Sequence, residues 1–230
     1  MVIGNGMVAA KFESYIQNDD FVIFASGVSN SKNIDAATFN REITLLLNVL
    51  EEYKNKTLVY FSTCSLYDPG ENESPYVLHK RKIEELIQKN VSSYYIFRVS
   101  NLVGKSANHN TILNFFYYHI NHKINFDLWT NSSRNLIDID DMLGIADHIL
   151  QKKIYQNQVI NIANPVSYNV NNIITTLEIS LGIKATYISI RKGSHFSIDI
   201  SLILPVIREL KMNFGELYLS HLIKKYYLHT

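Results

Sequence analysis

Three side chains in the stretch FSTCSLYDPGENESPYVLHKRK have the types and spacing that proton transfer requires. Thr63 follows an apolar run, and Tyr76 and Lys80 stand four residues apart further along the chain. Pro75 suits the first turn of a helix, so Tyr76 and Lys80 should share one helical face. A neighbouring ammonium lowers the pKa of a phenol, and a threonine hydroxyl can donate to the same substrate oxygen. The pattern predicts an acid/base site made of Thr63, Tyr76 and Lys80; the alternative is a surface loop before an ordinary amphipathic helix.

Two other clusters contain the small residues that a dinucleotide needs close to the backbone. The segment VIGNGMVAAKF holds G-x-G-x-x-A after a short apolar run and before a helical pattern. Glycines there allow a tight turn and the close approach of a pyrophosphate, whose charge is favoured by a helix N-terminus. The segment FASGVSNS places more small residues after an apolar strand, although a plain turn explains either segment when it is taken alone. The residues assigned to cofactor contact are Gly4, Gly6, Met7, Val8, Ala25, Ser26 and Gly27.

Short apolar runs alternate with longer segments of helical period along the chain. This alternation predicts an α/β fold in which helices cover both faces of a parallel sheet. Ligands of such folds bind beyond the carboxyl ends of the strands, and each cluster described above follows a predicted strand. The predicted strands are 2–4, 21–25, 57–62, 94–99, 159–163 and 186–190. The predicted helices are 7–17, 37–53, 76–89, 110–121, 140–152, 170–181 and 216–227.

The composition argues against several classes of function. The 22 basic and 21 acidic residues leave a net charge of +1, so electrostatic binding of nucleic acid or of a membrane surface is not expected. No apolar run reaches membrane-spanning length, and no basic region precedes an apolar run as in a signal peptide. The single cysteine, Cys64, rules out an internal disulfide and suits a reducing cytoplasm. No histidine spacing indicates a metal site.

The segments around the candidate site resemble the motifs of one family. STCSLYD followed by YVLHK is similar to the S-[ST]-x-x-[VL]-Y-G and Tyr-x-x-x-Lys motifs of the extended short-chain dehydrogenase/reductases. Within that superfamily the resemblance is to the NAD(P)-dependent sugar-nucleotide epimerases, dehydratases and reductases. It continues through FRVSNLVGKS, RNLIDIDDMLGIADHIL and VINIANPVSYNVNNIITTLEISLGI, in the order in which the family has these segments. The resemblance therefore covers nearly the whole chain.

This resemblance implies a role for each candidate residue. Tyr76 would be the acid/base for a sugar carbonyl or hydroxyl, and Thr63 would orient the reacting oxygen. Lys80 would lower the pKa of Tyr76 and hold the nicotinamide ribose. Asn101 and Arg134 would bind the nucleotide-sugar substrate, whose phosphates suit a bidentate guanidinium. The implied cofactor is NAD or NADP.

Departures from the family pattern bear on the cofactor and on the reaction. The family has two further strands and a helix between its glycine motif and the strand predicted at 21–25, and this chain lacks them. No residue can therefore be assigned to the adenosine ribose, which leaves the choice between NAD and NADP open. Cys64 and Ser65 replace the Asp-Glu pair of the sugar dehydratases, so dehydration is not expected. Asp68 stands where the family usually has glycine, and His79 is expected on a different helical face from the site.

The residues and the resemblance together predict a shortened enzyme. The expected fold is a Rossmann-like parallel sheet with helices on both faces, without the usual second and third strands, plus a small C-terminal substrate lobe. We expect a single domain over 1–230, with a cofactor core at about 1–125 and mainly the substrate lobe at about 126–230.

The expected reaction is reduction of a keto group on a nucleotide-activated deoxysugar by NAD(P)H, as in the synthesis of surface polysaccharide precursors. The alternatives are an NAD-dependent 4-epimerase and a catalytically silent binding subunit. A cytoplasmic location is expected. By analogy with family members, a homodimer could form through the helices at 37–53 and 76–89.

Overall fold

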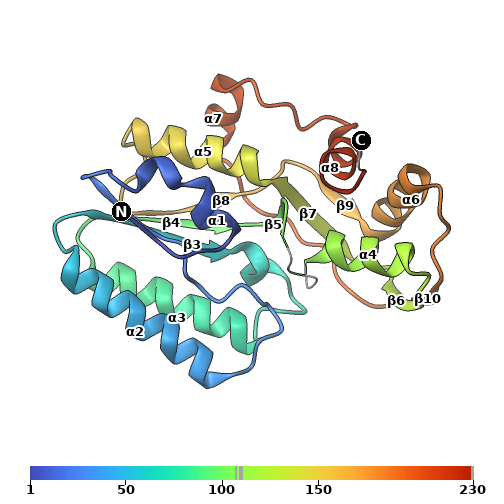
Figure 1. The fold of residues 1–230 in the computed structure, drawn as a ribbon, viewed down its shortest axis with the longest axis horizontal. Helices are drawn as coiled ribbons and strands as arrows, with labels where there is room; N and C mark the ends of the chain where they lie inside the picture. The colour runs from blue at the N-terminus through green and yellow to red at the C-terminus, as the bar shows by residue number, and fades with distance from the viewer. Residues whose placement is uncertain (107, 109–110, 229–230) are drawn as a thin grey trace.

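The centre of the computed structural model is a parallel sheet (Figure 1). The structure describes residues 1–106, 108 and 111–228. In their order across the sheet, the strands are β1 (Val2–Ile3), β2 (Phe21–Phe24), β3 (Thr57–Thr63), β4 (Tyr94–Val99) and β8 (Gln158–Ile162). β2, β3 and β4 are mostly apolar and buried, as strands covered on both faces should be. The predicted α/β fold class is confirmed.

Helices cover the two faces of this sheet, as Figure 1 shows. One face carries α2 and α3, whose apolar residues Leu46 and Ile83 belong to the same buried cluster as Phe24 of β2. The other face carries α1, a 3-10 turn and α5, which contribute to the larger core. The helix predicted at 7–17 is shorter in the structure, because the chain leaves the α conformation at Phe12. The bounds are α1 (Met7–Lys11), the turn Glu13–Tyr15, α2 (Ala36–Glu52), α3 (Pro75–Asn90) and α5 (Ile139–Gln151).

A second group of elements lies beyond the carboxyl ends of the central strands. Its strands are β5 (Asn101–Val103), β6 (Phe126–Trp129), β7 (Ser133–Asp138), β9 (Ser167–Asn169) and β10 (Tyr187–Ile190). β7 pairs with β5 in parallel and with β9 in antiparallel fashion, whereas β10 pairs with β6. The helices are α4 (Ile112–Asn121), α6 (Val170–Leu181) and α8 (Tyr218–Tyr227), whereas α7 (Leu204–Glu209) packs on α5 (Figure 1).

Five elements were not predicted from the sequence: β5, β6, β7, β9 and α7. The strand predicted at 186–190 is present as β10, but it lies outside the central sheet. The helix predicted at 110–121 is present as α4, and its predicted first residue, 110, is outside the described residues.

The sheet ends at β1. Within the described part of the chain, β1 pairs only with β2, in the register Val2 to Ile23 and Ile3 to Phe24. The chain passes directly from the 3-10 turn Glu13–Tyr15 to β2. This is the place at which the sequence predicted that two strands are lacking.

Two features are absent from the described residues, a membrane-spanning helix and a metal-binding cluster. No helix in them is both long and apolar enough to cross a bilayer. Nor do they contain a group of three or more His, Cys, Asp or Glu side chains that could hold a metal ion.

Candidate active site

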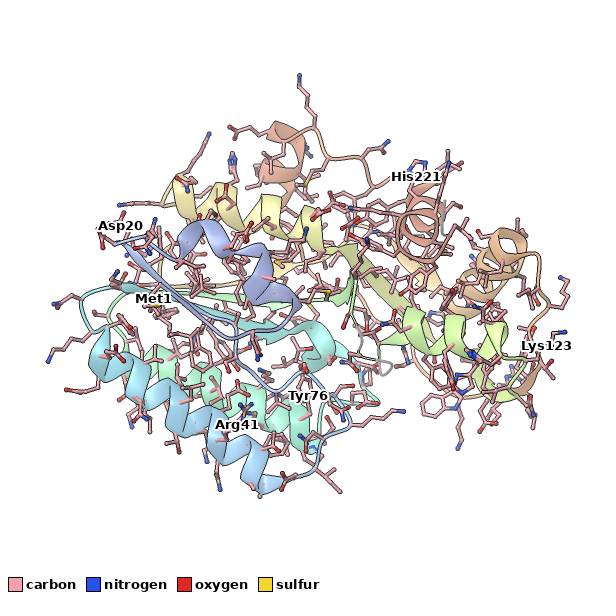
Figure 2. All side chains as sticks on the ribbon, viewed as in Figure 1. Met1, Asp20, Arg41, Tyr76, Lys123 and His221 are labelled. Carbon is pink, nitrogen blue, oxygen red and sulfur yellow. The ribbon has the colours of Figure 1, made fainter. Side chains whose placement is uncertain are left out.

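The end of β3 and the first turns of α3 bring Thr63, Tyr76 and Lys80 together. Thr63 is the last residue of β3, and Ser74 caps α3 by accepting a hydrogen bond from the Val77 backbone N–H at 3.3 Å. Tyr76 and Lys80 follow on one helical face and are both buried. A side-chain hydrogen bond joins Thr63 to the phenol of Tyr76. Tyr76 is labelled in Figure 2, in the half of the molecule that holds α2 and α3.

The ionisation of Tyr76 differs from the expectation. Burial raises the pKa of Tyr76 to about 12; the hydrogen bond with Thr63 opposes this rise, and the negative charge of Glu42 adds to it. The Lys80 nitrogen lies 6.0 Å from the centre of the Tyr76 ring and donates instead to Glu42 at 3.0 Å. The predicted lowering of the Tyr76 pKa by Lys80 is therefore wrong. Tyr76 is a neutral phenol at neutral pH.

Lys80 is enclosed by protein groups. Its ammonium group donates to Glu42 and, at 2.9 Å, to the hydroxyl of Tyr60 on β3. Burial lowers the pKa of Lys80, and the charge of Glu42 opposes that shift. His79 is buried, its Nε2 lies 2.9 Å from the other oxygen of Glu42, and it is not among the residues that line the cleft described below. Its ring also stacks on Phe39 of α2, which fixes it on this face of α3.

The glycine positions show where a dinucleotide can approach the backbone. Gly4 has a φ of +130°, and a Cβ there would lie 2.4 Å from the carbonyl oxygen of Ala25, so the turn needs glycine for its own packing. Gly6 precedes α1, and a Cβ there would meet no atom within 4 Å. The open space at Gly6 suits a pyrophosphate. At Gly27 the space of a side chain is already taken, because a Cβ would lie 2.6 Å from the Lys80 nitrogen.

The described residues fit one end of a dinucleotide and not the other. The turn at Gly6, followed by the partly buried Met7 and Val8, fits a pyrophosphate, and Ala25 and Ser26 follow β2 beside it. The adenosine end has no equivalent support. β1 has no second neighbouring strand within residues 1–106, 108 and 111–228, so no strand end there offers a side chain to the adenosine ribose.

A cleft with a volume of about 130 Å³ extends from Tyr76 to Arg134. Its floor includes Ser100, whose buried hydroxyl oxygen has no hydrogen-bond partner among the described residues. Phe196 and Ile198, from the irregular segment before α7, form an apolar part of its wall. The lining of the cleft therefore includes an acid/base group, a cation and an unsatisfied hydroxyl. A polar ligand with an anionic end suits this arrangement.

The two predicted substrate residues, Asn101 and Arg134, line the same cleft. The Asn101 side chain donates to the Asn135 carbonyl oxygen at 2.9 Å. The Arg134 guanidinium lies 3.8 Å from the carboxylate of Asp68, which also accepts a hydrogen bond from Ser194 at 2.7 Å. The position that is usually glycine in the family thus holds a carboxylate that competes for Arg134.

Several residues at this site were missed by sequence reasoning. A signal existed for Glu42, because it lies four residues before Leu46 and seven before Val49, in phase with the buried stripe of α2. A carboxylate in such a stripe must be paired. For Phe196 and Ile198 the only signal was the similarity of GSHFSIDISLI to the end of the family's substrate lobe, and their segment has no regular structure that could place them at the cleft.

The fold and this geometry agree with a comparison to family models. The model described as the NAD dependent epimerase/dehydratase family matches residues 4–163, which is more than half of the chain. The chain belongs to the NAD dependent epimerase/dehydratase family. The matched range contains the predicted cofactor residues and also Thr63, Tyr76, Lys80, Asn101 and Arg134. The predicted family is confirmed.

Solved structures share the family fold. UDP-glucuronic acid 4-epimerase from Bacillus cereus, in complex with UDP-glucuronic acid and NAD, is 20% identical, with a TM-score of 0.70 over 89% of this chain and 73% of that chain. dTDP-glucose 4,6-dehydratase from Bacillus anthracis, in complex with NAD, is 14% identical, with a TM-score of 0.69 over 95% and 77%. ADP-L-glycero-D-manno-heptose-6-epimerase from Helicobacter pylori is 21% identical, with a TM-score of 0.66 over 90% and 71%. At these identities the likeness establishes the fold. A search of curated protein sequences finds no match.

Proposed function

We propose that this family member reduces a keto group on a nucleotide-activated deoxysugar. The observation that supports it best is the buried, neutral phenol of Tyr76 beside Thr63. Hydride addition to a ketone leaves an alkoxide that must be protonated, and a neutral phenol is a suitable donor. Oxidation of a hydroxyl would require the same phenol to begin as a base. A pKa of about 12 for Tyr76 disfavours that direction.

The proposed cofactor is NAD or NADP, in keeping with the family description and with the NAD held by two of the solved structures. When bound, it would supply the hydride. The residues proposed to hold it are Gly4, Gly6, Met7, Val8, Ala25, Ser26, Gly27 and Lys80. Because the adenosine end lacks a supporting strand, we expect modest affinity and weak discrimination between NAD and NADP.

The proposed substrate lies along the cleft. Its keto oxygen would accept hydrogen bonds from Thr63 and Tyr76, and its phosphates would meet Arg134 and Asn101 at the other end. Ser100 could satisfy a sugar hydroxyl in between, since its own oxygen lacks a partner among the described residues. Nucleotide sugars that serve as precursors of surface polysaccharides are made and consumed in the cytoplasm, so a cytoplasmic location remains our prediction.

Replacing Arg134 with alanine should weaken binding of the nucleotide-sugar and of the matching nucleoside diphosphate. We expect a loss of roughly 1.5–3 kcal/mol, the range for hydrogen bonds to charged groups. The loss should be measured by calorimetry with the nucleoside diphosphate alone, so that the result does not depend on turnover.

The opposite change provides the control for Arg134. Asp68→Asn removes the carboxylate that lies 3.8 Å from the guanidinium while keeping an oxygen for Ser194, and should tighten nucleoside diphosphate binding. Arg134→Lys keeps the charge but loses the planar fork, so its affinity should be intermediate. Equal affinities in all these proteins would place the phosphates elsewhere.

The direct test of the proposed function is an assay with a nucleotide 4-keto-6-deoxysugar and NADH or NADPH. Loss of NAD(P)H absorbance, with formation of the reduced sugar, is the expected result. Interconversion of sugar epimers without net oxidation of NAD(P)H would favour the 4-epimerase, the second candidate, which is the activity named for the Bacillus cereus structure above. Absence of cofactor binding in calorimetry would favour a catalytically silent binding subunit.

A further inference from the structure

Glu42 is a fully buried carboxylate on α2 that contacts Lys80. Its Oε1 accepts hydrogen bonds from the Tyr60 hydroxyl at 2.7 Å and from the Lys80 ammonium at 3.0 Å. Its Oε2 accepts from the Val28 backbone N–H at 2.7 Å and lies 2.9 Å from Nε2 of His79. A buried charge is tolerated only when it is paired and hydrogen-bonded as completely as this.

The partners of Glu42 join three parts of the fold. The Tyr60 hydroxyl on β3 donates to Glu42 and accepts from Lys80 on α3 at 2.9 Å, so these three groups form a closed ring. The loop after β2 covers the ring closely, since a Cβ at Gly27 would lie 2.6 Å from the Lys80 nitrogen and 3.0 Å from Oε1 of Glu42. Val28 of the same loop is bound to Glu42 through its backbone. Glu42 therefore holds both Lys80 and this loop through hydrogen bonds to its carboxylate.

We propose that Glu42 is the positioning residue of this site, which holds the ammonium group of Lys80 and ties the loop after β2 to it. The inference deepens the proposed function and rests on it. Glu42 is not among the residues that line the cleft, so it acts through Lys80 and Val28 and not on the substrate.

The charge of Glu42 also determines what Lys80 can do to Tyr76. Burial alone would raise the pKa of Glu42, but the hydrogen bond with His79 and the charge of Lys80 lower it to about 2, so the carboxylate stays ionised. The ammonium charge is therefore compensated within the pair. The other titratable groups that act on Lys80 are Tyr60 on β3, which accepts its hydrogen bond, and Glu84 on α3, whose charge also raises the pKa of Lys80.

Removing the Glu42 charge should make Tyr76 easier to ionise. Glu42→Gln keeps a hydrogen-bonding oxygen and the shape of the side chain but loses the charge. Tyrosinate absorbance is followed against pH in the ligand-free protein, and the curve of the same protein carrying Tyr76→Phe is subtracted. We expect Tyr76 to ionise about one pH unit or more below wild type. Glu51→Gln, an exposed position on the same helix, is the matched control and should follow wild type. A folded Glu42→Gln protein in which Tyr76 ionises no earlier than in wild type overturns the inference.

A binding measurement tests the positioning role separately from the charge. Tyr60→Phe removes one hydrogen bond from Lys80 and one from Glu42 but leaves both charges. This variant also tests the proposal if Glu42→Gln does not fold. It should weaken NAD(P)H binding in calorimetry by about tenfold, as for the loss of one charge-assisted hydrogen bond, and leave the ionisation of Tyr76 in place. Unchanged NAD(P)H affinity in this variant would contradict the positioning role.

The two proposals fail in different ways. In the keto-sugar assay, Glu42→Gln should raise the KM for NAD(P)H and produce a loss of kcat at alkaline pH that wild type does not show before it unfolds, and Glu42→Asp should restore both in part. If wild type reduces no keto sugar while the Tyr76 titration and NAD(P)H binding change as expected, the proposed function is wrong and the inference on Glu42 stands. If wild type is active and Glu42→Gln matches it in KM and pH profile, Glu42 only stabilises the fold.

Discussion

Replacing Tyr76 with phenylalanine is expected to lower turnover by about 10²–10⁴-fold, the range that a positioned acid or base contributes. The change removes only the hydroxyl, so the ring still fills its buried place on α3 and nucleotide-sugar binding should remain. The physical reason is that the alkoxide formed on reduction would lose its phenol donor, while the hydroxyl of Thr63 already donates to Ser65 at 3.0 Å. Initial rates in the keto-sugar assay, together with calorimetric titration of the substrate, measure both parts of this prediction.

The pH dependence of wild type provides a second check on Tyr76. The phenol is active in its protonated form, and its pKa is raised to about 12, so this group should cause no loss of turnover between neutral pH and the start of alkaline unfolding. A fall in kcat centred near neutral pH in wild type would show that Lys80 does act on Tyr76. Tyr53→Phe, a change of the same kind at the surface end of α2, is the control and should leave turnover and its pH profile unchanged.

Replacing Glu84 with glutamine is expected to lower the free energy of unfolding by about 3 kcal/mol. Glu84 is buried on α3 and accepts hydrogen bonds from Nε and Nη2 of Arg98 on β4 and from the Ser62 hydroxyl. Breaking a buried ion pair on one side costs about 3–5 kcal/mol, because the partner charge is left uncompensated. The partial exposure of Arg98 places the expected value at the low end of that range.

Urea denaturation measures the effect, with Glu85→Gln at the exposed neighbouring position as the control. The double variant Glu84→Leu, Arg98→Met removes both charges and should recover most of the lost stability. A Glu84→Gln protein as stable as wild type would mean that Arg98 finds enough compensation elsewhere. Its hydrogen bond to the Tyr67 hydroxyl at 2.8 Å is the contact that could supply it.

The central part of the fold could be predicted because its signals are local. β2, β3 and β4 are nearly continuous apolar runs, and the cap and proline at the start of α3 fix the face that carries Tyr76 and Lys80. The strands β5 and β9 are three residues long, and their partner β7 is more than twenty residues away in the chain. Such strands form because tertiary contacts favour them, and they have no period of their own that a sequence could reveal.

The candidate site shows the same division between local and tertiary information. The spacing of Tyr76 and Lys80 was enough to place them together, but the pKa of Tyr76 is raised first by burial and then by the charge of Glu42, which comes from another helix. The sequence suggested that an ammonium near a phenol would favour tyrosinate. In the folded protein the ammonium group of Lys80 pairs with Glu42 instead. The spacing of two residues in the sequence cannot show that a third residue will pair with one of them.

The position of β1 has a consequence for how tightly any ligand can be held at the turn that follows it. β1 is two residues long and has one neighbouring strand among the described residues, so little of the free energy of folding protects it. Segments of this kind open locally without global unfolding, and their amide hydrogens exchange early. A ligand that needs the turn in its closed form must then shift this opening equilibrium as it binds, and its apparent affinity falls by the fraction of molecules in which the turn is open. Binding would in return slow amide exchange at Ile3 and Gly4, so the exchange rate at this edge of the sheet would report whether the ligand is bound.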